Sequence, residues 1–340
     1  MKIAIFGAGS IGCLVGGSLL AKGNDVVFIG KERIAGEIEK HGLTISDLEN
    51  RVTHLPKESI KYSVTPDAIA GADVILLCVK CTHTREAAKE IAIYANKNAI
   101  IYSLQNGVGN TAILREELKG FDVVAAMVGF NAVQLENNRF HRATDAGLVL
   151  GKNVASHELA RLLRNAHIPA SISNNMQEVL WGKLCLNLNN ALNVLSDLPL
   201  KQQLENRSYR KILGICISEA LEVMTAKGIT PEKIGKVKPK YLPFILNLPD
   251  PIFSLAARSM MKMDDEARSS MWEDLQKRRE PEIDYLNGAI VKAGEENMVA
   301  TPANRIICAL VKEAFAAGSS PRLSGEQLLS KIENLDSAKA

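Results

Sequence analysis

A glycine-rich turn near the start of the chain has the spacing that suits dinucleotide phosphates. Residues 7–12 read Gly-Ala-Gly-Ser-Ile-Gly; the apolar run Ile3–Phe6 precedes them, and apolar residues at helical spacing follow. In a strand–turn–helix unit such glycines permit the tight turn, let the backbone approach a pyrophosphate and let helix and strand pack closely, while the helix N-terminus offers unpaired N–H groups. The alternative is that the glycines serve packing alone. We predict a cofactor site formed by Gly7, Ala8, Gly9, Ser10, Ile11 and Gly12.

The end of the second predicted strand, Asp25–Ile29, indicates which dinucleotide is bound. An NAD enzyme usually places a carboxylate there for the ribose hydroxyls, whereas an NADP enzyme places cations near the 2′-phosphate. Here Gly30 follows the strand, and Lys31 and Arg33 come next. Glu32 lies between the two cations, so a solvated charge cluster at a helix start is the alternative. We predict NADP(H), with Lys31 and Arg33 as the phosphate contacts.

Two further polar residues follow buried strands. The apolar run 73–79 delivers Lys80, and the strand 99–104 delivers Asn106. Ligands bind at the carboxyl ends of strands in open α/β sheets, so both side chains are predicted at one ligand-binding edge. For Asn106–Gly107 the alternative is a plain turn.

A lysine and two amides accompany an otherwise apolar helical pattern in the second half. Lys183 and Asn187 are one turn apart and share a face, and Asn190 lies near that face. Such polar residues are unusual on an otherwise apolar helix, so a functional role is one interpretation. The alternative is a Lys183 that reaches solvent with its stem on the core.

The pair Cys78 and Cys81, with His83 after it, has the spacing of half a metal site or a redox motif. No second such pair exists in the sequence, and this one closes a strand instead of opening a helix. We predict no metal and no redox role. The six scattered cysteines suggest buried free thiols in a reducing compartment.

Composition limits the classes of function that remain. The chain has 340 residues, 46% of them hydrophobic and 23% charged, and a net charge of +3. This length suggests about two domains, and the mild charge gives no reason to expect a nucleic-acid partner. The longest apolar stretch, residues 123–130, is far short of the roughly twenty residues of a spanning helix. Neither a membrane segment nor a cleavable signal is predicted, which favours a cytoplasmic protein.

Strands alternating with helices through residue 172 predict a Rossmann-type doubly wound parallel sheet with an antiparallel appendage, and long helical patterns then predict an all-α domain over 173–340. The expected helices there include one from Asn174 or Asn175 to Leu192, one over 204–227, one over 253–263, and one that Pro281 begins. The segment 230–251, rich in proline and lysine, is predicted to be irregular and exposed. The cofactor domain is therefore expected at 1–172.

Motifs across nearly the whole chain resemble the ketopantoate reductase (2-dehydropantoate 2-reductase) family. The similar segments are the glycine turn 7–12, then 78–80, 104–107, 181–184 with Asn187, 269–271, Arg279, 282–288 and 301–304. The resemblance implies a 6-phosphogluconate-dehydrogenase-like arrangement of the two domains. It also implies reduction of 2-dehydropantoate to (R)-pantoate with NADPH, a step toward pantothenate and coenzyme A.

The resemblance also assigns roles to residues. Lys183 would be the general acid, and Glu282 would hold lysine, cofactor and substrate in position and keep the lysine charged. Asn106, Asn187, Asn190 and Ser270 would bind the substrate, with Asn106 and Lys80 also beside the cofactor. The implied partners are a small 2-oxo acid and, in a homodimer, a second copy of the chain.

Two departures from the family pattern keep alternatives open. Many members have a second asparagine eight residues after the catalytic lysine, where this chain has Ala191, and Asn190 is one residue short of that position. The segment 233–251 is also longer than compact members of the family need. One alternative is a paralogue that reduces another 2-oxo acid. Another is an NADP-binding sensor without turnover, although the polar residues of the catalytic set are present.

Overall fold

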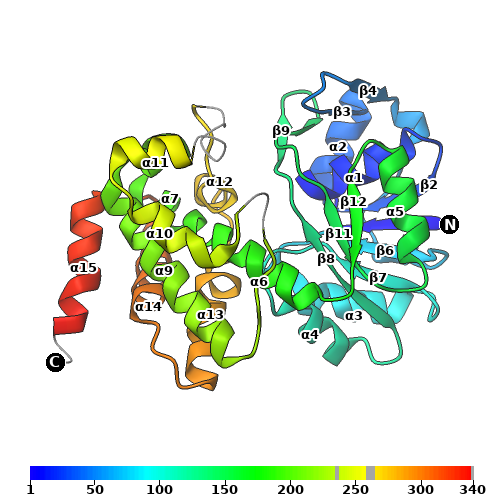
Figure 1. Ribbon diagram of the computed structural model, residues 1–340. Coiled ribbons are helices and arrows are strands. Elements are labelled where there is room, and N and C mark those ends of the chain that lie inside the picture. Colours follow the sequence, from blue (N-terminus) through cyan, green and yellow to red (C-terminus); the bar gives the residue numbers. More distant parts are fainter. Residues whose placement is uncertain (234–236, 258–264, 338–340) are drawn as a thin grey trace. The chain divides into compact units, whose positions relative to one another are not determined.

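The computed structural model describes residues 1–233, 237–257 and 265–337, and the chain forms two compact units, Met1–Met176 and Gln177–Ala340 (Figure 1). The predicted boundary after residue 172 falls within the last strand of the first unit, β12 (Ala170–Ser173). The two units are described separately below.

An eight-stranded sheet forms the centre of the first unit, in the order β12-β11-β8-β7-β6-β1-β2-β5. Neighbouring strands are parallel except β8 and β11, which are antiparallel. The predicted doubly wound parallel sheet is therefore confirmed. Its bounds are β1 Lys2–Phe6, β2 Asp25–Ile29, β5 Lys61–Ser63, β6 Val74–Leu77, β7 Ile100–Ser103, β8 Asp122–Val128 and β11 Leu148–Gly151.

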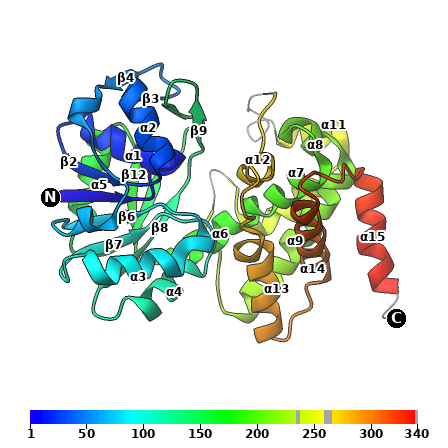
Figure 2. The same cartoon turned by 180° about the vertical axis from the view of Figure 1, so that it is seen from behind.

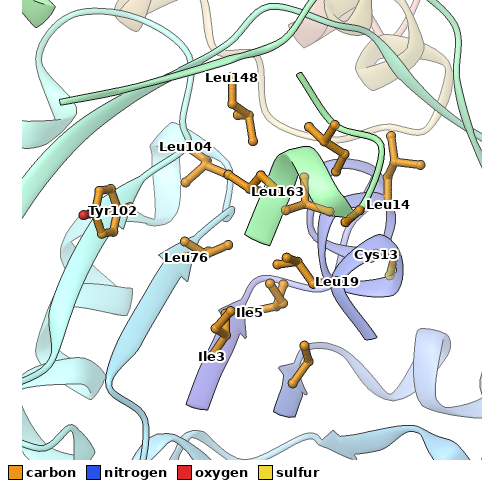
Figure 3. Packing of buried hydrophobic residues seen from close by; sticks show 14 of the residues in the cluster. Ile3, Ile5, Cys13, Leu14, Leu19, Leu76, Tyr102, Leu104, Leu148 and Leu163 are labelled. Carbon is orange, nitrogen blue, oxygen red and sulfur yellow. The ribbon is translucent and has the colours of Figure 1, made fainter. Parts of the chain in front are cut away.

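Alternation along the strands divides the core of this unit into two layers. Ile3 and Ile5 of β1 face one layer, which Figure 3 shows together with Cys13, Leu14 and other buried residues. Ala4 and Phe6 face the opposite layer. Helices supply the apolar partners on both sides: α1 (Ser10–Leu20), α2 (Glu32–His41) and α5 (Ser156–Asn165) on the first, α3 (Thr84–Tyr94) and α4 (Asn110–Glu117) on the second. The short 3-10 turns are η1 Lys57–Ser59, η2 Pro66–Ile69 and η3 Cys81–His83.

A second, four-stranded sheet replaces the simple appendage that the sequence predicted. Its order is β4-β3-β10-β9, with β3 at Leu43–Ser46, β4 at Val52–Leu55, β9 at Ala132–Leu135 and β10 at Arg139–Arg142. The parallel pairing of β3 with β10 joins two hairpins that are distant in sequence. Phe140 at the centre of this pairing is fully buried. The sequence predicted an antiparallel appendage, but not this long-range parallel pairing.

The second unit is helical, as predicted (Figure 2). Its helices are α6 Met176–Asn187, α7 Asn189–Ser196, α8 Leu200–Glu205, α9 Arg207–Ala226, α10 Leu242–Asn247, α11 Asp250–Ala256, α12 Ser270–Gln276, α13 Asn287–Glu296, α14 Pro302–Ala317 and α15 Gly325–Ser337. The 3-10 turns are η4 Pro239–Tyr241 and η5 Ile283–Tyr285. None of the helices in the described ranges has the length and apolar character needed to cross a membrane.

Several predicted helix bounds were wrong. The single helix expected to reach Leu192 is interrupted at Leu188, which keeps a right-handed helical backbone, so the apolar spacing continues across the break. The helix expected over 204–227 begins at Arg207, where the Asn206 side chain accepts from the Ser208 amide. Pro281 does not begin a helix, because η5 and α13 start later.

The segment predicted to be irregular, 230–251, contains ordered helical structure. Its helices α10 and α11 each carry a proline in the first turn, where the missing N–H costs no intrahelical bond. Leu246 and Phe253 are buried, so these helices pack on the unit. Residues 234–236, and 258–263 of the helix predicted over 253–263, lie outside the described residues.

Candidate active site

The glycine turn has the geometry that a phosphate-binding backbone requires. Gly7 has a φ of +108°, and a Cβ there would lie 2.7 Å from the Val79 amide nitrogen. A Cβ at Gly12 would lie 2.3 Å from the Gly7 carbonyl oxygen, so this glycine lets α1 pack against the turn. A Cβ at Gly9 would meet nothing within 4 Å, which leaves open space beside the backbone. Close packing thus explains Gly7 and Gly12 but not Gly9.

The turn is also fixed to the end of the neighbouring strand. The amides of Gly7 and Ala8 both donate to the Ile29 carbonyl oxygen, each at 2.9 Å. Gly9 is the N-cap of α1, and within the described chain no side chain caps this helix. The residues Ser10, Ile11 and Gly12 therefore present first-turn N–H groups to any anion at the turn.

Gly30, where NAD enzymes carry a carboxylate, has no room for a side chain. A Cβ at this position would lie 2.4 Å from Tyr62 Oη and 2.8 Å from the Ala8 Cβ. The Tyr62 hydroxyl donates to the Lys31 carbonyl oxygen at 2.9 Å, which holds it against the strand end. The site therefore excludes the usual acidic ribose ligand for a steric reason that the sequence did not reveal.

Lys31 and Arg33 lie together at the start of α2. Lys31 is the N-cap residue and Arg33 is in the first turn, and both side chains are exposed. Arg33 Nη2 donates to Gln134 Oε1 of β9 at 3.3 Å, so the second sheet contributes to the position of this guanidinium. Two cations beside a helix N-terminus form a suitable environment for a phosphate group.

Lys80 and Asn106 follow the paired strands β6 and β7, in which Leu77 is opposite Ser103. Lys80 is the N-cap of η3, and Asn106 precedes Gly107, whose φ is +80°. The structure thus brings both residues to one edge of the sheet, as predicted. The Asn106 carbonyl oxygen accepts from Asn110 Nδ2 at 2.6 Å and from Cys81 Sγ at 3.2 Å, so side chains hold this turn.

Cys78 and Cys81 lie in surroundings that are typical of structural thiols. Burial raises the pKa of the Cys78 thiol to about 12, which leaves it protonated near neutral pH. The buried Cys81 thiol donates to a backbone carbonyl, as described above, and His83 lies 3.4 Å from Glu86 on the surface. Among the described residues, no three His, Cys, Asp or Glu side chains gather as metal ligands.

In the second unit, α6 carries Lys183 beside a glycine that has a packing role. A Cβ at Gly182 would lie 2.5 Å from the Glu232 carbonyl oxygen, and the Glu232 amide donates to the Glu178 carbonyl oxygen at 3.0 Å. The chain after α9 therefore crosses α6 in direct backbone contact next to Lys183. This contact explains a glycine inside a helix, where it would otherwise destabilise the structure.

Burial affects polar groups on both Lys183 and Asn187, which lie one turn apart on α6. Burial lowers the pKa of the Lys183 ammonium below its ordinary value, the opposite of the effect expected from Glu282. The Asn187 side chain is only 7% exposed, and its Nδ2 has no hydrogen-bond partner in the described structure. A buried amide donor without a partner is destabilising unless a ligand satisfies it.

Asn190 and Ser270 are connected through residues that the sequence did not single out. The Ser269 hydroxyl donates to the Asn190 carbonyl oxygen at 3.2 Å, and the Ser269 amide donates to Asn193 Oδ1 at 2.9 Å. Ser269 also caps α12, whose first residue is the exposed Ser270. Asn193, fully buried on α7, thus fixes the turn that presents Ser270.

Glu282 is 4% exposed and directly precedes η5. The segment after it is anchored by a buried polar chain, in which Asn287 Nδ2 donates to Asn304 Oδ1 at 3.0 Å and Asn304 Nδ2 donates to Glu219 Oε2 at 2.6 Å. The motifs 282–288 and 301–304 therefore meet in the core, and their asparagines hold α13 and α14 to α9.

Sequence reasoning missed Asn193 and Asn110, which both support turns that carry predicted site residues. Each is an asparagine at or in a helix, and each is at most 3% exposed. An asparagine inside an apolar helical pattern was the only available signal, and local sequence does not show which turn such a side chain supports.

Two family models match the chain. "Ketopantoate reductase PanE/ApbA" matches residues 3–154, and "Ketopantoate reductase PanE/ApbA C terminal" matches residues 175–315. Together they cover most of both units, and the family comprises nicotinamide-dependent reductases.

Curated relatives and solved structures agree with these matches. The 2-dehydropantoate 2-reductases of Pyrococcus horikoshii and Archaeoglobus fulgidus are 30% and 27% identical, and the alignments cover 94% and 92% of this chain and 100% and 97% of the relatives. A ketopantoate reductase structure from Ralstonia eutropha has a TM-score of 0.80 at 30% identity, over 94% of this chain and 99% of that one. A D-mandelate dehydrogenase with NADH and anilino(oxo)acetate shares the fold, with a TM-score of 0.77 at 22% identity over 94% of this chain and 99% of that one.

Proposed function

Because the chain belongs to the ketopantoate reductase family, whose members are oxidoreductases acting on CH–OH groups, we propose that it reduces 2-dehydropantoate to (R)-pantoate with NADPH, in the synthesis of pantothenate and coenzyme A. When bound, the cofactor supplies a hydride to C2 of the 2-oxo acid. The protein's residues bind both ligands and provide the proton.

The preference for NADPH is supported by the end of β2. Gly30 cannot carry the carboxylate of an NAD site, because Tyr62 and Ala8 fill the space. Lys31 and Arg33 instead offer two positive charges at the start of α2. In this proposal both cations bind the 2′-phosphate, and residues 7–12 form the pyrophosphate site. The backbone N–H groups of Ser10, Ile11 and Gly12 are its donors, because those of Gly7, Ala8 and Gly9 donate to carbonyl oxygens of the protein.

The single observation that carries the catalytic proposal is the presence of two polar side chains affected by burial on one turn of α6. One turn of this helix holds an ammonium whose pKa burial lowers and a buried amide donor that lacks a partner. We assign Lys183 as the general acid, which donates its proton to the oxygen that becomes negative at C2. We assign the Asn187 amide to the distal hydroxyl of the substrate, which would accept from its unpaired Nδ2.

The remaining predicted residues have supporting roles in this mechanism. Asn106 and Ser270 bind the carboxylate and the reacting oxygen, and Asn190 contributes near Ser270. Glu282 orients Lys183, substrate and cofactor, and Lys80 lies beside the cofactor ribose. The substrate carboxylate, once bound, raises the lowered pKa of Lys183 and so returns the lysine to its charged, proton-donating form.

A direct assay tests the proposed activity. Purified protein is mixed with NADPH and ketopantoate, and oxidation is followed by nicotinamide absorbance, with NADH as the matched comparison. We expect turnover with NADPH and a lower kcat/KM with NADH. Binding of NADPH without turnover of any 2-oxo acid would instead identify a cofactor sensor.

A second candidate is the reduction of a different 2-oxo acid. Two observations favour it: Ala191 replaces the second asparagine of many family members, and a D-mandelate dehydrogenase shares the fold. A panel of ketopantoate, benzoylformate and branched aliphatic 2-oxo acids separates the candidates. A higher kcat/KM for an acid without the distal hydroxyl would reject ketopantoate as the substrate.

Assembly and location form a separate part of the proposal. A ketopantoate reductase from Staphylococcus aureus is described as dimeric and shares the fold, with a TM-score of 0.71 at 18% identity over 94% of this chain and 100% of that one. We propose a homodimer in the cytoplasm. Sedimentation of the purified protein tests the assembly.

A further inference from the structure

A buried polar network lies beneath the Asn106–Gly107 turn. Ser103 Oγ donates to Gln105 Oε1 at 3.0 Å, and Gln105 Nε2 donates to Thr84 Oγ1 at 2.8 Å. The single proton of the Thr84 hydroxyl has two acceptors within reach, the Cys81 carbonyl oxygen at 2.7 Å and Asn110 Oδ1 at 2.9 Å. Asn110 Nδ2 completes the chain at the Asn106 carbonyl oxygen, 2.6 Å away. Ser103, Thr84 and Asn110 are each at most 3% exposed, and Gln105 is 7% exposed.

The network fixes which way the Asn110 amide is turned. Because the Asn106 carbonyl oxygen can only accept, the atom of the Asn110 amide that faces it at 2.6 Å must be the donor Nδ2, and Oδ1 then faces the Thr84 hydroxyl. The thiol of Cys81 approaches the same carbonyl oxygen at 3.2 Å, and Asn110 Nδ2 is 3.3 Å from its sulfur. The Asn106 carbonyl oxygen thus accepts from two donors on different elements, Cys81 of η3 and Asn110 of α4, and it points toward the protein interior.

The orientation of that carbonyl determines the orientation of the next amide. The chain has no cis peptide in its described parts, and in a trans peptide the N–H points opposite to the C=O of the same unit. The Gly107 N–H therefore points away from Asn110 and Cys81. Within the described residues this N–H has no protein acceptor. A positive φ of +80° at Gly107 lets the chain leave this peptide without strain.

The position of Gly107 in the sheet indicates which part of a bound dinucleotide its N–H would contact. The strands β5, β2, β1, β6, β7 and β8 have the order of two mononucleotide-binding halves, with β1, β2 and β5 in one half and β6, β7 and β8 in the other. The glycine turn and Lys31 belong to the adenosine half. Gly107 follows β7, in the half that receives the nicotinamide riboside.

We propose that the Gly107 N–H donates to an oxygen of the nicotinamide riboside half of the bound cofactor, and that Asn110 is the positioning residue that sets this peptide. Thr84 supports the Asn110 amide by bridging its Oδ1 and the Cys81 carbonyl oxygen, and the Cys81 thiol assists as a weaker donor. The inference rests on the proposed nicotinamide-dependent function but concerns binding, so it can be tested without turnover.

The experiment compares two probes of different length. NADPH spans both halves of the site, whereas 2′,5′-ADP carries only the adenosine half with its 2′-phosphate. Asn110→Asp keeps the acceptor for Thr84 and removes the donor to Asn106, at nearly constant volume. We expect its Kd for NADPH to rise about tenfold, the effect of roughly one hydrogen bond, while its Kd for 2′,5′-ADP stays unchanged.

Further variants separate positioning from damage to the fold. Asn165→Ala, at the exposed end of α5, is the matched control and should leave both constants unchanged. Thr84→Val should reproduce the selective loss, whereas Thr84→Ser should retain wild-type binding. If the Asn110→Asp variant does not fold, the test uses the Thr84 variants instead: NADPH binding should be weakened in Thr84→Val and retained in Thr84→Ser.

Two results would overturn the inference. One is an Asn110→Asp variant that binds NADPH within about twofold of the wild type. The other is an equal loss for both probes, which would show general damage to the unit. If the wild type binds NADPH but does not reduce ketopantoate, the proposed function fails while this test remains valid. If the wild type prefers NADH, the same comparison is made with NADH and AMP.

Discussion

The two units prepare polar groups for ligands by different physical means. In the proposed function, the ligand-facing groups of the first unit are backbone amides at the glycine turn together with side chains at strand ends, such as Lys31 and Arg33, and the sheet fixes where these segments lie. In the second unit they are side chains on helices: a lysine with a lowered pKa and an amide whose Nδ2 lacks a partner. Backbone donors at an open edge are inexpensive to keep, whereas buried polar side chains reduce stability.

This difference determines what substitutions should do. In the first unit a changed residue acts through shape or surface charge, because the proposed pyrophosphate donors are backbone N–H groups and the proposed 2′-phosphate contacts are exposed cations. In the second unit a changed residue removes the reacting group itself. The largest kinetic effects are therefore expected in the helical unit and the cleanest binding effects in the nucleotide unit.

The largest effect is expected from Lys183→Ala. Removing the proposed general acid should lower kcat by about 10² to 10⁴, while the Kd for NADPH stays near that of the wild type because most of the proposed cofactor contacts lie in the first unit. Steady-state kinetics and fluorescence titration measure the two quantities. Lys211→Ala, on α9, is a control for the loss of a lysine from this unit.

Near-wild-type turnover in Lys183→Ala would remove this lysine from the mechanism. An equal loss in kcat and in NADPH affinity would contradict the proposal that the second unit supplies the proton donor and the first unit binds most of the cofactor.

The next effect is expected from Lys31→Ala combined with Arg33→Ala. Losing both cations should weaken NADPH by roughly 10- to 100-fold and leave NADH nearly unchanged, because only NADPH carries the 2′-phosphate. Direct titration with each coenzyme measures this. Lys40→Ala, in the last turn of the same helix, is the matched control. Equal weakening of both coenzymes would contradict the assignment.

The variant Gly30→Asp tests whether the shape of the site at the end of β2 also limits NADH binding. A carboxylate at this position should not by itself create an NAD site, because its Cβ would lie 2.4 Å from Tyr62 Oη. We expect reduced affinity for both coenzymes in the single variant and recovery of NADH binding when Tyr62→Ala is added. Tight NADH binding by the single variant would show that Tyr62 does not restrict the site.

The pH dependence of kcat/KM reports the state of Lys183 in the free enzyme. Burial lowers its pKa, so the required ammonium form should be lost at a pH below the ordinary lysine value. Above that pKa, kcat/KM should fall about tenfold per pH unit. The limb for kcat should lie at higher pH, since a bound carboxylate raises the pKa. A profile that Lys183→Arg leaves unchanged would exclude this lysine as the titrating group.

Much of the first unit could be predicted because its signals are local. Apolar alternation marks β1, and a continuous apolar run marks β6; the glycine turn marks the junction with α1. The pairing of β3 with β10 could not be predicted, because nothing in either hairpin encodes a partner about ninety residues away. The steric restriction by Tyr62 at Gly30 was hidden for the same reason.

In the helical unit, types of element were easier to predict than their bounds. Periodicity predicted helices, but it could not show the break at Leu188, where the backbone remains helical. Prolines led to the prediction of an irregular segment where Pro243 and Pro251 in fact occupy first turns of α10 and α11. The lowered pKa of Lys183 depends on tertiary burial, which sequence does not give.

The smallest effect is expected from Asn187→Leu. Replacing a buried amide that has an unpaired donor should raise the free energy of unfolding by about 1 kcal/mol, because the desolvation penalty disappears. Thermal unfolding without ligands measures this, and the KM for ketopantoate should increase at the same time. Asn193→Leu is the contrasting control: that amide is fully hydrogen-bonded, so its loss should destabilise the protein.

A less stable Asn187→Leu variant would mean that Nδ2 has a structural partner and is not kept for a ligand. A more stable variant with an unchanged KM would separate this amide from substrate binding.

The most direct test of the central claim is a crystal structure with NADP⁺ and pantoate bound. The proposal requires that the ammonium of the helical unit reach the ligands held by the glycine-turn unit. We predict that Lys183 Nζ lies within about 3.2 Å of the C2 oxygen of pantoate, with Asn187 Nδ2 at the distal hydroxyl. A Lys183 side chain directed into bulk water, away from the nicotinamide ring, would contradict the proposed mechanism.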